Sequence, residues 1–224
     1  YEGKGPVESY DQIAAIYKQA LSVNPENVAA LTDLGGLAAV AGREAEAREY
    51  LDKALELDPN NVEALVKAGD VLTATAEYSR VISYLNRAVA LAPDRLDIHN
   101  SLAAALTAVG SVDEAIVHLN RAIELSGDSQ PEFHYNLGHA YGAKSDLENA
   151  AVSFRSALAA NPSSVKYRLW LAMTLLDKGE PVEAKAEFEK VLAGEPENVD
   201  ARARLGVILL GEDRLDDAIA EFRR

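Results

Sequence analysis

The chain has 224 residues and carries 22 Lys and Arg against 36 Asp and Glu, a formal net charge of −14 at pH 7. Apolar residues make up 48% of it, enough to build a core and too many for a disordered acidic tail. The absence of cysteine excludes disulfides, thiolate metal sites and a cysteine nucleophile. The acidic charge disfavours nucleic acid as a partner, and no apolar run approaches the ~18 residues that membrane insertion needs.

The first helix is expected from about Tyr10 to Ser22, and after it one kind of turn recurs along the chain. Four segments share the pattern x-Pro-x-(Asn or Ser)-Val, and a fifth is a looser copy: Asn24–Val28, Asp58–Val62, Asn161–Val165, Glu195–Val199 and, looser, Ala92–Leu96. Their prolines are 34 residues apart, or 69 apart where one residue is inserted in Ser126–Pro131. A fixed period of this length is the signature of a repeat protein.

Each repeat is predicted to contain two helices, because its apolar residues recur at spacings of three and four. In the first repeat, Leu31 and Leu34 mark one helix, and Leu51 marks the next. Small residues at the Gly35 and Ala47 positions would let the two antiparallel helices approach closely. Glycines stand between the two helices in three repeats, where a left-handed residue is favoured: Gly42, Gly110 and Gly179. The second repeat has Ala76 there, which costs up to about 1 kcal/mol if that backbone conformation is required.

This pattern resembles the tetratricopeptide repeat family. The resemblance covers about Tyr10 to Arg224 and implies an all-α, right-handed superhelical solenoid of antiparallel helix pairs. The implied repeats are 28–61, 62–95, 96–130, 131–164, 165–198 and a shortened 199–224. Residues 1–27 would hold the second helix of a partial N-terminal repeat, with Tyr1–Gly5 as the tail of its first helix. We therefore expect the chain to be a segment of a longer protein.

We find no residue pattern that indicates catalysis, a cofactor or a metal. There is no glycine-rich phosphate loop and no nucleophile elbow. His134 and His139 are five residues apart, about 140° around a helix, whereas a metal-binding pair needs one face. The paired carboxylates, such as Asp113 and Glu114, fall near the starts of second helices, where negative charge suits the helix dipole. The sequence therefore predicts a protein that is not an enzyme.

In the tetratricopeptide repeat family the first helices line a concave groove that usually binds a peptide. The resemblance implies that the following residues face this groove: Glu63, Val66, Asp70, Asp97, Asn100, Glu132, Tyr135, His139, Leu169 and Met173. Four of them would form an acidic stripe in which the charges reinforce one another: Glu63, Asp70, Asp97 and Glu132. Acidic residues in a first turn are also favoured by the helix dipole alone, so Asp70, which lies in mid-helix, is the informative member. Leu169 and Met173 would form an apolar pocket.

The leading interpretation is a non-enzymatic protein–protein interaction scaffold that binds a peptide or protein segment in its groove. The ligand would carry basic residues toward repeats two to four and an apolar anchor toward repeat five. Two alternatives stay open: the recruiting region of a larger enzyme such as a transferase, and a scaffold that assembles through end-to-end contacts into a homo-oligomer. The expected compartment is the cytoplasm, with the periplasm or another compartment as the alternative.

Overall fold

The computed structural model describes residues 6–127 and 129–223, so the predicted helical tail at Tyr1–Gly5 lies outside the described residues. The helices fall into two compact units, residues 1–109 and 110–224. Among its described residues the first unit contains six helices: α1 (Pro6–Val23), α2 (Val28–Val40), α3 (Glu44–Leu57), α4 (Val62–Ala74), α5 (Tyr78–Leu91) and α6 (Leu96–Ala108). The described part of the second contains seven: α7 (Val112–Ser126), α8 (Pro131–Ala143), α9 (Leu147–Ala160), α10 (Val165–Asp177), α11 (Pro181–Gly194), α12 (Val199–Gly211) and α13 (Leu215–Arg223).

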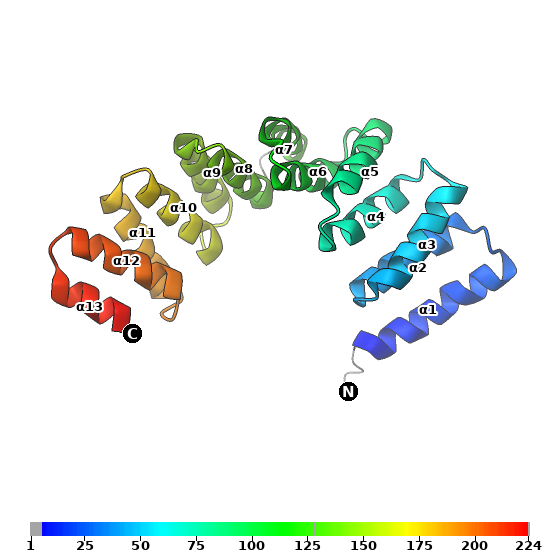
Figure 1. The fold of residues 1–224 in the computed structure, drawn as a ribbon, viewed down its shortest axis with the longest axis horizontal. Coiled ribbons are helices and arrows are strands. Elements are labelled where there is room, and N and C mark those ends of the chain that lie inside the picture. Colours follow the sequence, from blue (N-terminus) through cyan, green and yellow to red (C-terminus); the bar gives the residue numbers. More distant parts are fainter. Residues whose placement is uncertain (1–5, 128, 224) are drawn as a thin grey trace. The chain divides into compact units, whose positions relative to one another are not determined.

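Within each unit every helix packs against the next one in the chain (Figure 1). Helices α2 and α4, the first helices of successive repeats, also contact each other. The described residues form helices and turns without a strand, as the spacing of apolar residues predicts. None of these helices is both long and apolar enough to cross a membrane. The all-α fold of antiparallel helix pairs is therefore confirmed.

The recurring turn doubles as the start of the next helix. In four repeats the Asn or Ser that precedes the valine of this turn accepts, through its side chain, a hydrogen bond from the backbone N–H three residues further on. These residues are Asn27, Asn61, Ser164 and Asn198. This side chain satisfies one of the N–H groups that a helix start leaves unpaired, which stabilises the helix by about 1 kcal/mol. The x-Pro-x-(Asn or Ser)-Val pattern thus encodes both a helix end and an N-cap.

The turn between the two helices of a repeat needs a left-handed residue. Gly42, Gly110 and Gly179 have φ of 73°, 85° and 86°, as predicted. Ala76 adopts φ 57° at the equivalent position, so the left-handed conformation persists where the sequence has no glycine. The close approach predicted at Gly35 is also present, because a Cβ there would lie 2.6 Å from Leu51 Cγ.

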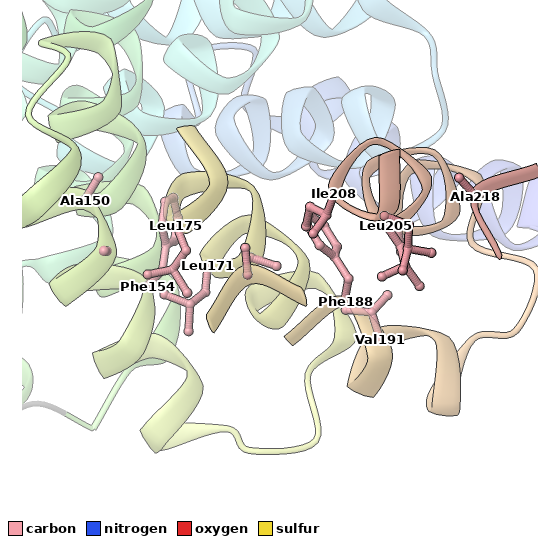
Figure 2. Packing of buried hydrophobic residues seen from close by; sticks show 14 residues of the cluster. Ala150, Phe154, Leu171, Leu175, Phe188, Val191, Leu205, Ile208 and Ala218 are labelled. Carbon is pink, nitrogen blue, oxygen red and sulfur yellow. The ribbon is translucent and has the colours of Figure 1, made fainter. Parts of the chain in front are cut away.

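The core of the second unit runs through successive helix pairs (Figure 2). Phe154 of α9 and Leu171 of α10 form one end of it, and Phe188 of α11 packs next to Ile208 of α12. These side chains are almost completely buried. The continuous core fixes the first helices α8 and α10, which carry the aromatic residues described below.

Candidate functional site

A groove with a volume of about 760 Å³ opens within the first unit. It is lined mainly by α1, α2 and α4, and by side chains at the starts of α3 and α6. Three predicted site residues border it directly on α4: Glu63, Val66 and Asp70. Asp97 borders it from the first turn of α6. A volume of this size accommodates several side chains of a bound segment.

One wall of the groove is apolar. Ile13 and Tyr17 of α1 face the groove together with Leu37 and Val40 of α2, and Val40 is 90% exposed. Val66, only 8% exposed, contributes to the floor. These side chains were not predicted, because α1 is a second helix and α2 belongs to the first repeat, whereas every predicted groove residue lies on a first helix of repeats two to five. The sequence offers one signal for this apolar surface, which is Val40, an apolar residue in the last turn of α2.

Acidic side chains of α4 and α6 also line the groove, but their charges do not simply add as predicted. Arg95 Nη1 lies 3.1 Å from Glu63 Oε2, and the same guanidinium also pairs with Asp97. Lys67 Nζ lies 3.6 Å from Glu63 Oε1. Glu63 and Asp97 thus share the positive charge of Arg95, which offsets part of the negative charge that they bring to the groove.

Asp70 differs from its neighbours because it makes no ion pair with any residue in the described part of the chain. Desolvation by the groove walls raises its pKa, and the charges of Asp97 and Glu63 raise it further. Lys67 acts in the opposite direction but more weakly. The side chain is nevertheless open to solvent. Asp70 is thus an exposed carboxylate whose surroundings favour the approach of a positive charge.

Two further predicted residues do not belong to this groove. Asn100 of α6 is half-buried and does not border it. Glu132 belongs to the second unit, at the first turn of α8. There it accepts a hydrogen bond from the Tyr167 hydroxyl, and Lys166 Nζ lies 3.7 Å from its Oε1.

An aromatic cluster surrounds His139 in the second unit. The His139 ring lies 4.5 Å from Tyr135 and 4.3 Å from Trp170, both edge to face, with distances taken between ring centroids. Phe154 packs behind them, 5.4 Å from His139, and Tyr167 lies 5.3 Å from Tyr135. The sequence predicted that Tyr135 and His139 face the groove, but Trp170 was not among the predicted residues.

A positive charge already sits on this cluster. Lys166 Nζ lies 3.9 Å above the centroid of the Tyr135 ring. Burial and the charge of Glu132 raise the pKa of Tyr135, and burial together with the charge of Lys166 lowers the pKa of His139. His139 is therefore neutral at pH 7 and packs as an aromatic ring.

Leu169 and Met173 of α10, the predicted apolar pocket, are half-buried at the margin of the core. Their role as a ligand anchor stays a prediction. Among the described residues, no group of three or more His, Asp and Glu side chains is arranged to hold a metal ion.

Comparison with protein families decides the identity of the repeat. One profile described as "Tetratricopeptide repeat" matches residues 41–106 and 175–224, just over half of the chain. A second profile with that description matches 9–62 and 135–190, and a "TPR repeat" profile matches 105–145. The chain belongs to the tetratricopeptide repeat family. A search of curated proteins finds no match.

Solved structures of similar fold include proteins that are described as TPR proteins. YrrB, described as "a TPR protein with an unusual peptide-binding site", is 21% identical with a TM-score of 0.71; the match covers 84% of this chain and 96% of that one. MamA from Desulfovibrio magneticus RS-1 is 21% identical over 76% of this chain and 96% of that one, with a TM-score of 0.71. PilF from Pseudomonas aeruginosa is 20% identical over 87% of this chain and 88% of that one, with a TM-score of 0.73. At these identities the likeness establishes the fold.

Proposed function

We propose that this tetratricopeptide repeat protein is a non-enzymatic interaction scaffold that binds a protein segment in the groove of its first unit. The segment carries an apolar residue that packs against Ile13, Tyr17 and Val40, and a Lys or Arg that reaches Asp70. The observation that carries this proposal is that exposed apolar side chains of α1 and α2 line the same groove as the acidic side chains of α4 and α6. Membership of a family of interaction scaffolds supports the general class, and the description of YrrB as a peptide binder supports a peptide as the form of ligand.

Charge on the groove favours a basic ligand. Four carboxylates border it, from Glu44, Glu63, Asp70 and Asp97, against the two cations Lys67 and Arg95. The net charge at the groove is therefore negative, as is that of the whole chain. Complementary charge speeds association and fixes the register of the ligand, while burial of the apolar residue supplies most of the affinity.

In this proposal the apolar anchor lies beside the basic residue, both within the first unit. This arrangement differs from the sequence-based expectation, which put the anchor near Leu169 and Met173. The new position follows from the exposed apolar side chains of α1 and α2 that share the groove with Asp70. The ligand is then a short amphipathic segment, bound as an extended chain or as a helix in the groove.

The experiment that tests this function is a peptide array. Each ten-residue peptide of the first series carries one Lys and one Leu, and the peptides differ in the spacing between these two residues. A second series has Glu in place of Lys, and a third has Ser in place of Leu. We expect binding of the Lys and Leu series only, and loss of most of that binding in Asp70→Asn. Asp52→Asn, which removes the same charge from α3 outside the groove, is the matched control. Equal binding by the Lys and Glu series would refute the proposal.

A further inference from the structure

We propose that the aromatic cluster of the second unit is a separate binding site for an arginine side chain, and that Lys166 covers this site in the unliganded protein. The site consists of the Tyr135 ring face, the Glu132 carboxylate and the neighbouring rings of His139 and Trp170. It differs from the groove of the first unit in position and in chemistry, because its main surface is a ring face and not a carboxylate wall.

The position of Lys166 shows which chemistry the site accepts. Its ammonium group lies 3.9 Å above Tyr135 and 5.7 Å from the Tyr167 ring centroid. It is also 3.7 Å from Glu132 Oε1. Two ring faces and a carboxylate thus surround a single cation, which is the arrangement that recognises cationic side chains. The site selects positive charge even before a ligand arrives.

Lys166 is held loosely enough to be displaced. Its side chain is 52% exposed, and an ion pair or a cation–ring contact at such a site contributes little to stability. A guanidinium is planar and less strongly hydrated than an ammonium, so it stacks better on a ring while one of its N–H groups bonds a carboxylate oxygen. Tyr167 donates to Glu132 Oε2, which leaves Oε1 for the ligand once Lys166 has moved.

The inner side of the site is rigid, which favours selective binding. Phe154, 2% exposed, supports both His139 and Trp170 from the core. The rings therefore keep their relative orientation when Lys166 leaves, and the ligand does not have to order them. Trp170 is the only tryptophan in the chain, so its fluorescence reports this site and not the groove of the first unit.

The test follows Trp170 fluorescence during titration with the peptide acetyl-Gly-Arg-Gly-amide at constant ionic strength. Lys166→Met removes the competing cation, and we expect it to bind this peptide about two- to fivefold more tightly than the wild type. Lys190→Met is the matched control, because it removes the same charge from an exposed lysine that contacts Glu187 and no ring. We expect the citrulline version of the peptide, which has the same shape without the charge, to give no saturable change.

A second pair of variants separates the ring from general electrostatics. In the Lys166→Met background, Tyr135→Phe keeps the ring face and should keep the tighter binding, whereas Tyr135→Leu should abolish it. The emission spectrum of Trp170 without peptide shows whether each variant preserves the packing. Equal affinities of Lys166→Met and Lys190→Met would overturn the proposal, and so would tight binding that persists in Tyr135→Leu. Neither result depends on Asp70, so this experiment tests the aromatic site independently of the proposed groove in the first unit.

Discussion

Gly138 tests how closely the helices of a repeat must approach beneath the aromatic cluster. A Cβ at this position of α8 would lie 2.6 Å from Cε1 and 2.7 Å from Cζ of Phe154. Ordinary carbon contacts are about 3.5–4.0 Å, so Gly138→Ala has to move the ring by roughly 1 Å. Phe154 is fully surrounded by the core of the second unit, and overpacking of this kind costs about 1–3 kcal/mol.

The matched variant lies four residues along the same helix. Gly142 has no atom within 4 Å of its Cβ position, so Gly142→Ala gains helix propensity, at most about 1 kcal/mol, without a clash. Both substitutions replace glycine by alanine in α8, so their difference isolates the steric contribution. We expect Gly138→Ala to be less stable than Gly142→Ala by about 1–3 kcal/mol.

Urea unfolding followed by Trp170 fluorescence and by far-UV circular dichroism measures this difference. The Trp170 ring stacks 6.2 Å from Phe154, so it senses the affected repeat directly, which matters because repeat proteins can unfold unit by unit. We also expect a shifted Trp170 emission in folded Gly138→Ala. Equal unfolding midpoints for the two variants would refute the argument that Gly138 is required for close approach.

Three further predictions concern single positions. Ala76→Gly should raise the free energy of unfolding by about 0.5–1 kcal/mol, because it relieves a left-handed alanine; thermal unfolding against Ala74→Gly checks it. Burial and the charge of Lys166 lower the pKa of His139 below 6.5. As the pH falls, the unfolded chain therefore binds a proton at His139 before the folded protein does, so the free energy of unfolding should fall below about pH 6.5. The urea unfolding midpoint of His139→Gln should depend less on pH than that of the wild type. Desolvation and the charges of Asp97 and Glu63 raise the pKa of Asp70, so ionised Asp70 destabilises the fold at pH 7. Asp70→Asn should therefore have a higher urea unfolding midpoint than the wild type at pH 7. An unchanged or lower midpoint would contradict this reasoning.

The repeat and its helices could be predicted from the sequence because their causes are local and recur every 34 residues. The turn prolines, the caps at Asn27 and Asn61, and the left-handed Gly42 each depend on a few neighbouring residues. Ala76 shows the opposite case, because the fold imposes the left-handed backbone conformation on a residue that does not favour it. Regular local signals of this kind are enough to specify a solenoid.

The details of the candidate sites were harder to predict because they depend on side chains from different repeats. Arg95 was seen as part of a turn, yet its guanidinium joins Glu63 of its own repeat to Asp97 of the next one. Trp170 meets His139 across two first helices, a contact that the repeat period does not encode. Asp70 was singled out as the informative acid for its place in mid-helix, but its lack of an ion-pair partner within the described residues could be seen only in the structure.

The most direct test of the proposed groove is a charge exchange at Asp70. An array-selected peptide with one Lys and one Leu, and its Lys-to-Glu counterpart, are each titrated against the wild type and Asp70→Lys by fluorescence anisotropy. The wild type should prefer the Lys peptide, and Asp70→Lys should reverse the preference while Asp52→Lys leaves it unchanged. If Asp70→Lys still prefers the Lys peptide, Asp70 does not contact the basic residue of the ligand.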